Sequence, residues 1–114
     1  MAGADPPTTW RDGDEDFDRD VLPAVARRGP FPARCPACSS PTLHVYFHRH
    51  DARHDRGGSW VWCSHCRRYS HASAKPPPGW RNLDLVDPQR LTHAPSYLET
   101  LAAAIDAHWA VATA

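Results

Sequence analysis

The four cysteines of the chain form two matched pairs, Cys35 with Cys38 and Cys63 with Cys66. Each pair encloses two residues, and 24 residues separate the pairs. A turn of this length directs both thiolates at one ion, and two such turns supply the four sulfur ligands of a tetrahedral Zn²⁺ site. The usual separation is about 15–20 residues, so this interval is slightly long. The spacing predicts one structural Zn²⁺ ion bound by all four cysteines.

Two other uses of the cysteines have to be weighed. Disulfide bonds would require export, and the opening residues 1–7 have neither the basic nor the apolar part of a signal peptide. A thioredoxin-like redox site would need one such pair at the start of a helix, not two pairs. We therefore expect a cytoplasmic protein with reduced thiols and no membrane-spanning segment. A closed four-cysteine site also predicts no Lewis-acid chemistry at this metal.

The run from His48 to Asp55 contains two His-Asp pairs, His50-Asp51 and His54-Asp55. A single-metal hydrolase could use His48, His50 and His54 as ligands and leave one position open for water. The run is expected in a hairpin loop, however, where ligand geometry is loose. The favoured interpretation is a solvated polar loop whose histidines titrate near neutral pH.

A basic-aromatic patch follows the second cysteine pair, with Arg67, Arg68 and Tyr69 close to Trp60 and Trp62. Arginines neutralise phosphates and aromatic rings stack on unpaired bases, so nucleic-acid binding is one hypothesis. Against it, the formal net charge of the 114 residues is zero, whereas nucleic-acid modules are usually strongly basic. Tryptophan and arginine are also favoured in protein interfaces, which makes protein binding the leading hypothesis.

Two further histidines lie near the second cysteine pair. His65 stands inside the pair and could replace a cysteine as ligand, although four cysteines make that unnecessary. His71 lies five residues beyond Cys66 and could orient a carbonyl or a thiolate of the site. Both are expected to be structural or surface residues and not catalytic ones.

Charge and composition divide the chain at residue 30. Residues 1–30 have a formal charge of −3, residues 31–81 of +6 and residues 82–114 of −3. The acidic first part has few apolar side chains, which predicts a disordered tail over residues 1–30. The alternative is that its apolar residues dock on the folded part: Trp10, Phe17, Val21 and Leu22. Residues 31–114 are expected to form one domain.

Three strands are predicted at residues 43–48, 59–63 and 66–72, which are rich in β-branched and aromatic side chains. Together with the cysteine turns they indicate a three-stranded antiparallel sheet that binds one ion at its end. The prolines of residues 75–79 end the sheet. A C-terminal amphipathic helix is predicted to begin near Pro95, with an apolar stripe that covers the sheet or faces a partner. The stripe contains Leu98, Leu101, Ile105, Trp109 and Ala112.

The order of these motifs resembles that of a known group of proteins. The matching segments are Trp60 to Ser73, Pro78-Gly-Trp80, Leu91-Thr-His93 and Tyr97-Leu98-Glu99. They resemble small bacterial zinc-ribbon proteins that are encoded beside polymorphic toxins and regarded as candidate immunity proteins. The resemblance runs from about Cys35 to Trp109 and implies non-catalytic protein binding in the cytoplasm, with no catalytic residues.

We therefore expect a small α+β protein, a four-cysteine zinc ribbon with a C-terminal amphipathic helix. Its expected function is that of a zinc-binding protein-interaction module that neutralises a toxin. A nucleic-acid-binding zinc ribbon is the second hypothesis, and a metal-dependent hydrolase that uses the His-Asp run is the third. The expected contact surface consists of Arg67, Arg68, Tyr69, His50, Asp51, His54 and Asp55.

Overall fold

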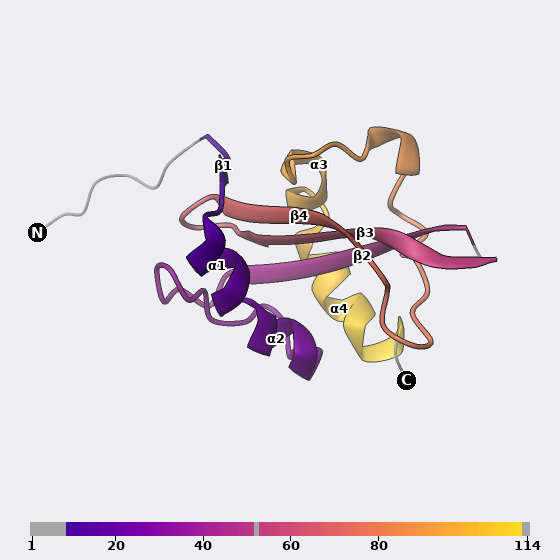
Figure 1. Ribbon diagram of the computed structural model, residues 1–114, viewed down its shortest axis with the longest axis horizontal. Helices are drawn as coiled ribbons and strands as arrows, with labels where there is room; N and C mark the ends of the chain where they lie inside the picture. Colours follow the sequence, from indigo (N-terminus) through magenta and orange to yellow (C-terminus); the bar gives the residue numbers. More distant parts are fainter. Residues whose placement is uncertain (1–8, 52, 113–114) are drawn as a thin grey trace, which may run out of the picture.

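The centre of the fold is a sheet with the strand order β1-β4-β3-β2. The computed structural model describes residues 9–51 and 53–112, with the backbone only for His54 and Ala112. The elements are β1 (Arg11–Asp12), α1 (Glu15–Asp20), α2 (Leu22–Arg27), β2 (Leu43–Asp51), β3 (His54–Cys63), β4 (Arg68–Ala74), a 3₁₀ turn η1 (Pro88–Arg90), α3 (Ser96–Glu99) and α4 (Ala102–Ala112) (Figure 1). Within the described ranges, every helix is too short or too polar to cross a membrane. The predicted small α+β class is confirmed.

The sheet has four strands and not the predicted three. Strands β2, β3 and β4 pair antiparallel, as expected, but β1 adds to the outer edge of β4 in parallel. The backbone N–H groups of Arg11 and Gly13 donate to the carbonyl oxygens of Arg67 and Tyr69, at 2.8 and 2.7 Å. A two-residue strand has no hydrophobic periodicity of its own, so the sequence pattern could not indicate it.

The β2–β3 hairpin is longer than predicted and includes most of the His-Asp run. Gly57 and Gly58 lie inside β3, opposite Arg49 and His48. A Cβ atom on Gly57 would stand 1.9 Å from the His48 carbonyl oxygen, so only glycine allows the strands to approach this closely. The hairpin therefore extends past the other strands as a projecting arm (Figure 1).

Side chains and one short bridge cover the outer edge of β2. An uncovered edge strand would present unpaired backbone groups to other chains. Here the backbone groups of the odd-numbered residues of β2 form hydrogen bonds with residues outside the strands. The partners are Ala33 for Leu43, the Trp109 indole for Val45, the Trp80 indole for Phe47 and the Asn82 amide for Arg49. The edge is thus closed to strand addition over most of its length.

Both faces of β2 are covered, because all six residues from Leu43 to His48 are buried. The even-numbered face carries aromatic rings, which bond to the segment that follows the sheet. Trp60 donates its indole N–H to the Thr92 carbonyl oxygen at 2.9 Å, and Trp62 donates to the Glu99 carboxylate at 2.8 Å. The C-terminal third of the chain is therefore attached to this face through polar contacts at the rims of large rings.

The N-terminal segment requires a correction to the predicted tail. Over residues 9–30 the chain is folded, and Phe17, Val21 and Ala24 are buried in the common hydrophobic core. These three side chains are four and three residues apart and form one helical face, which the surrounding aspartates obscured in the sequence. The docking alternative holds for Phe17 and Val21, and for Trp10, which packs partly buried against the same core, but not for Leu22, which is 59% exposed. The first eight residues of the predicted tail lie outside the described residues.

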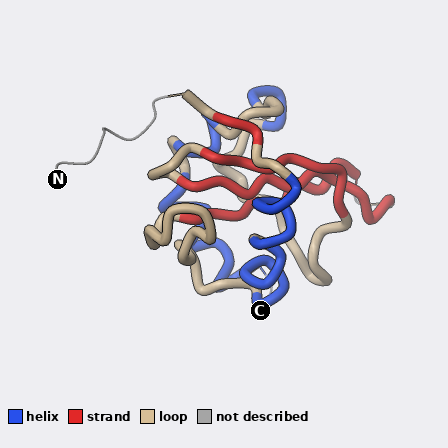
Figure 2. Tube along the Cα trace, turned by 60° about the vertical axis from the view of Figure 1, so that its left-hand side comes forward, coloured by secondary structure: helices blue, strands red, loops and turns tan. Residues whose placement is uncertain are grey.

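The C-terminal helix is divided in two. The prediction of one helix from Pro95 is met by α3 and α4, with a break between Glu99 and Ala102. The apolar stripe faces the sheet, the first of the two predicted alternatives, because Leu98, Ile105 and Trp109 are buried. Figure 2 shows α4 running beside the strands, and its main contacts within the sheet are with β2.

Candidate metal centre

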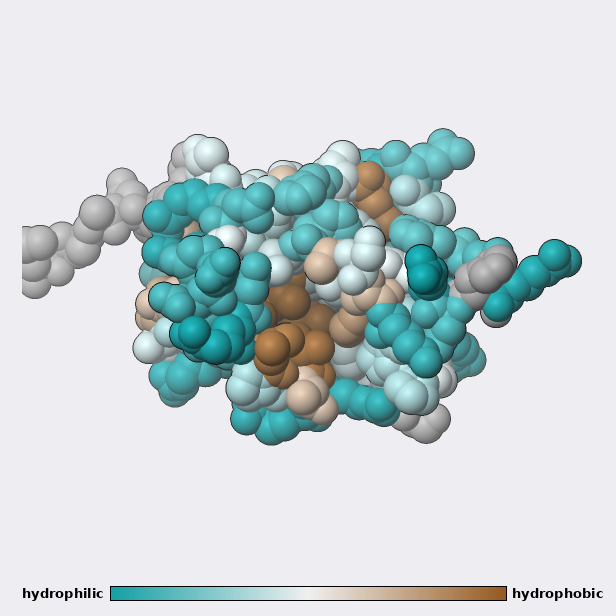
Figure 3. All heavy atoms as spheres, viewed as in Figure 1, coloured by the Kyte–Doolittle hydropathy of each residue, from teal (hydrophilic) through white to brown (hydrophobic). Residues whose placement is uncertain are grey.

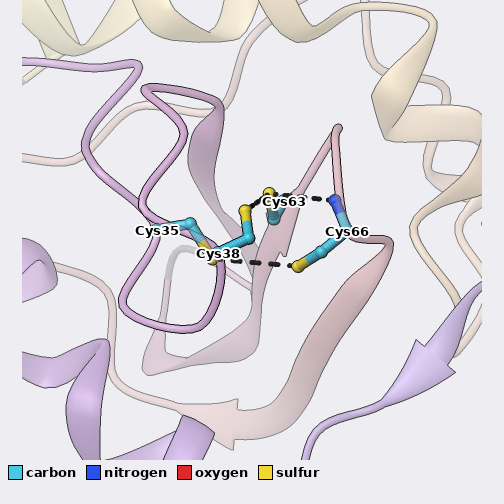
Figure 4. Close-up of side chains that lie close together, drawn as sticks. All are labelled: Cys35, Cys38, Cys63 and Cys66. Carbon is cyan, nitrogen blue, oxygen red and sulfur yellow. Dashed lines mark hydrogen bonds between the residues drawn. The ribbon is translucent and has the colours of Figure 1, made fainter. Parts of the chain in front are cut away.

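The four cysteines converge at one end of the sheet. Their sulfur atoms all lie within 4.8 Å of one another, with Cys35 3.8 Å from Cys66 and Cys38 3.6 Å from Cys63 (Figure 4). All four are free thiols, and only Cys38 is more than slightly exposed. Residues that are far apart in the chain thus form one compact sulfur cluster.

The cluster has the dimensions of a tetrahedral zinc site. With Zn–S bonds of about 2.3 Å, the edges of the sulfur tetrahedron measure about 3.8 Å. The two short sulfur–sulfur distances, 3.6 and 3.8 Å, match that edge. Four soft thiolates in this geometry suit Zn²⁺ among the common divalent metals. The residues present therefore fit the predicted ion.

The two cysteine turns share one backbone design. Each is closed by a residue in the left-handed region, Ser39 with φ 66° and Arg67 with φ 63°. Their N–H groups donate to the carbonyl oxygens of Cys35 and Cys63, at 2.8 and 3.0 Å. In each turn another backbone N–H approaches the first sulfur at 3.4 Å, from Ala37 to Cys35 and from Cys66 to Cys63. Local hydrogen bonding in each turn therefore helps to orient the first sulfur of the pair.

Burial and local hydrogen bonds shift the pKa values of the thiols in opposite directions. Desolvation raises the pKa of Cys35 to about 12 and also raises the pKa of Cys66. Burial pushes the pKa of Cys38 upward too, but hydrogen bonds, first that of the Ser40 backbone, outweigh it and lower the value to about 7. A dication reverses this balance because a coordinating thiol is deprotonated outright. The cluster is thus suited to holding a metal and poorly suited to holding four bare thiolates.

The basic-aromatic patch is largely occupied by the N-terminal segment. The Arg67 guanidinium lies 4.5 Å from the centre of the Trp10 ring, and Arg68 approaches the Asp14 carboxylate at 3.9 Å. Tyr69 is buried, and its hydroxyl is 3.1 Å from His93 Nδ1. The predicted contact surface is wrong for Tyr69, which is buried, and Arg67 and Arg68 pack against Trp10 and Asp14 of the chain itself.

The His-Asp run is divided between buried and exposed positions. His50, Asp51 and Asp55 are exposed on the hairpin arm, where Asp55 pairs with Arg49 and with Lys75. The side chain of His54 lies outside the described residues. Among the residues that the structure describes, the cysteines form the one group of three or more ligand atoms at metal-binding distances. The run thus provides no preformed three-ligand site in that part of the chain.

A buried polar network next to the cysteines was not foreseen. His44 is 6% exposed, and its Nδ1 lies 2.9 and 3.0 Å from the two Asp106 carboxylate oxygens. Its Nε2 lies 2.8 Å from the Ser64 hydroxyl. Ser64 donates to Glu99 at 2.7 Å, and the same carboxylate oxygen accepts from Trp62. Glu99 and Asp106 are seven residues apart, two helical turns, and this spacing was the available sequence signal.

The Asp106–His44–Ser64 order resembles the relay of serine hydrolases, but the fourth member changes its chemistry. A general base must accept the serine proton, whereas the Ser64 proton is directed at the Glu99 carboxylate. Ser64 also follows Cys63 directly in the second cysteine turn. The network therefore links the second cysteine turn to α3 and α4 through half-buried hydrogen bonds.

The geometry establishes a cysteine cluster compatible with a zinc-binding module. Comparison with known proteins found no matching family model, no matching curated protein and no matching solved structure. The metal-binding arrangement is therefore argued from the sulfur positions, their burial and their hydrogen bonds.

Proposed function

We propose that this chain is a non-catalytic protein-interaction module whose zinc-ribbon scaffold is held by one structural Zn²⁺ ion. The observation that carries the proposal is the closed sulfur cluster. All four coordination positions are supplied by cysteines, so none is left for a substrate or a reactive water. The ion joins the turn before β2 to the turn between β3 and β4, and the buried network extends this support to the two C-terminal helices.

The exposed surface favours a protein partner over nucleic acid. Leu22 on α2 and Val111 on α4 are 59% and 55% exposed. Figure 3 shows an apolar area in the region where Figure 1 draws α2. Exposed apolar areas rimmed by polar residues are typical of protein contacts. Arg67 and Arg68, the arginines first considered for phosphates, are instead engaged by Trp10 and Asp14.

Within this class we propose a toxin as the partner, on the resemblance to candidate immunity proteins. The test is to express the chain together with the product of the adjacent toxin gene. Cell survival and a complex that persists through gel filtration are expected, since an immunity protein must hold its toxin tightly. The proposal fails if the adjacent gene encodes no toxin, or if the chain neither binds that toxin nor restores growth.

A matched pair of variants tests the contact face. Leu22→Ser changes an exposed residue of the apolar area on α2, and we expect it to weaken the complex at least tenfold. Leu85→Ser is the control, because Leu85 is equally exposed, at 62%, but lies in the connection before η1. Equal effects of the two substitutions would show that the apolar area of α2 and α4 is not the contact face.

A further inference from the structure

A cleft on the aromatic face, at the end of the sheet away from the cysteines, gathers half of the histidines of the chain. It has a volume of about 470 Å³ and lies between the ends of β3 and β4 and the segment around η1. Trp60 lines it together with His48, His50, His71 and His93. None of these residues belongs to the cysteine cluster. The cleft therefore brings together imidazole side chains that are separate from the cysteine cluster.

His71 is held in a defined tautomer and orientation. Its ring stacks on Trp60, with centroids 4.3 Å apart, and its Nδ1 lies 3.0 Å from the Ser59 carbonyl oxygen. A carbonyl oxygen can only accept, so Nδ1 carries the hydrogen and the neutral ring has a lone pair on Nε2. Gly58 makes room for the stack, since a Cβ there would lie 2.9 Å from Trp60 and 3.2 Å from His71.

His93 is held against His71 in a similar way. Its Nδ1 is 3.1 Å from the Tyr69 hydroxyl, which can accept a hydrogen bond from it. The Nε2 atoms of His71 and His93 have no hydrogen-bond partner among the described residues. In metal sites, ligating histidines almost always donate their second N–H to a carbonyl, carboxylate or water, and here a carbonyl and a hydroxyl occupy that role.

The separation of the two rings fits a shared metal ion. With N–metal bonds of about 2.0–2.1 Å, two imidazole rings on a tetrahedral ion have centres about 5.2 Å apart. The centres of His71 and His93 are 5.1 Å apart and their planes are perpendicular, at 89°. The His48 and His50 rings are 6.2 Å apart, too far for the same arrangement.

We propose that His71 and His93 bind a second divalent transition-metal ion through their Nε2 atoms. Imidazole suits Zn²⁺, Cu²⁺ and Ni²⁺, and two neutral ligands give a weak, exchangeable site. The remaining positions are open to water, to the exposed His50 on the same cleft, or to a ligand from outside. The proposal does not rest on the proposed function, and it replaces the ligand set that the His-Asp run suggested.

The test uses the full chain loaded with one equivalent of Zn²⁺, into which further Zn²⁺ is titrated by calorimetry and equilibrium dialysis. We expect a second equivalent to bind, with shifts of the Nε2 nitrogen NMR signals of His71 and His93. His93→Ala should weaken this second step at least about tenfold, since even outer partners of metal ligands are worth about 10–100-fold. Tyr69→Phe, which keeps the ring and removes the hydroxyl, should weaken it about tenfold.

The control is His65→Ala, which removes another exposed histidine and should change the second step less than twofold. A total of one bound equivalent, or a second equivalent that His93→Ala leaves unchanged, would overturn the proposal. An equal loss in the His65 and His93 variants would also overturn it, because it would indicate unspecific surface binding. If His71→Ala fails to fold, the His93 and Tyr69 variants still decide. The first equivalent reports separately on the cysteine cluster.

Discussion

The cysteine cluster and the histidine cleft are two candidate metal sites built on opposite principles. The cluster joins four sulfurs, three of them buried, and its turns close the coordination sphere. The cleft brings together two imidazoles at 5.1 Å beside an open volume. Ligand number and burial differ together: the cluster forms part of the core, while the cleft is a surface feature next to the projecting hairpin arm.

The difference implies two roles: an ion at the cysteine cluster would stabilise the fold, and an ion at the histidine cleft would exchange. A small core becomes stable when a metal adds its binding free energy to folding, and this requires ligands that come together only in the folded state. Cys35 and Cys66 meet this condition, because 31 positions separate them in the chain. A two-ligand site on an already folded surface adds little to stability. The cysteine end should therefore govern folding, and the histidine end should tolerate change.

The largest expected effect is that of zinc removal. Structural zinc contributes about 10–16 kcal/mol of binding free energy in zinc-finger peptides, more than a domain of this size has to spare. We expect a chelator, or Cys63→Ser, to unfold the domain cooperatively, as followed by circular dichroism and hydrogen exchange. Unchanged spectra and exchange rates after verified loss of the ion would remove the distinction between the two sites.

The N-terminal segment should add to the free energy of unfolding together with the end of the sheet that carries the cysteines. Arg11 donates to the Cys66 carbonyl oxygen at 3.1 Å, and Phe17 is 3% exposed. Phe17→Ala should lower the free energy of unfolding by about 3–5 kcal/mol, the usual cost of emptying a buried phenylalanine site. Urea titration measures the change, with the exposed Leu22→Ala as control. A loss below about 1 kcal/mol would be close to the effect of a surface substitution and would support the predicted disordered tail instead.

The buried network should have an intermediate effect. Ser64→Ala leaves His44 Nε2 and the Glu99 carboxylate each without one partner. Leaving buried polar groups unpaired costs about 1–3 kcal/mol, which urea titration would detect. Ser73→Ala is the control, since Ser73 is exposed on β4. Equal stability of the two variants would mean that the network does not connect the metal centre to the helices.

The smallest expected effect is a pH dependence at the histidine end. Burial, and then the neighbouring His50, lower the pKa of His48 below its ordinary value of 6.5. The unfolded chain therefore takes up this proton first as the pH falls. The contribution of neutral His48 to stability should be complete above about pH 6.5 and should be lost as the pH falls toward the folded pKa.

This dependence is measured as the difference between the wild type and His48→Gln in urea titrations from about pH 8 to pH 5. The wild type should lose more stability on acidification than the variant. The exposed Ser73→Ala, which removes no titratable group, should retain the wild-type slope. Parallel curves for the wild type and His48→Gln would contradict the assigned direction.

Local patterns allowed part of the structure to be predicted. The cysteine cluster was predictable because each turn is encoded by two cysteines three positions apart, and four thiols have few other uses together. The inward stripe of Leu98, Ile105 and Trp109 was predictable from its helical period. By contrast, the closure of the β2 edge by Trp80 and Trp109 joins residues more than 30 positions apart. No local pattern specifies such a contact.

The sequence by itself therefore determined the donor set of the metal centre, the central strands and the C-terminal helical stripe, because these follow from spacing within a few residues. Only the tertiary structure decided that Phe17 is core, that Ser64 meets His44 and Glu99, and that His71 meets His93. The physical reason is that these contacts depend on strand register and on how distant segments pack. Neither is recorded in the periodicity of any one segment.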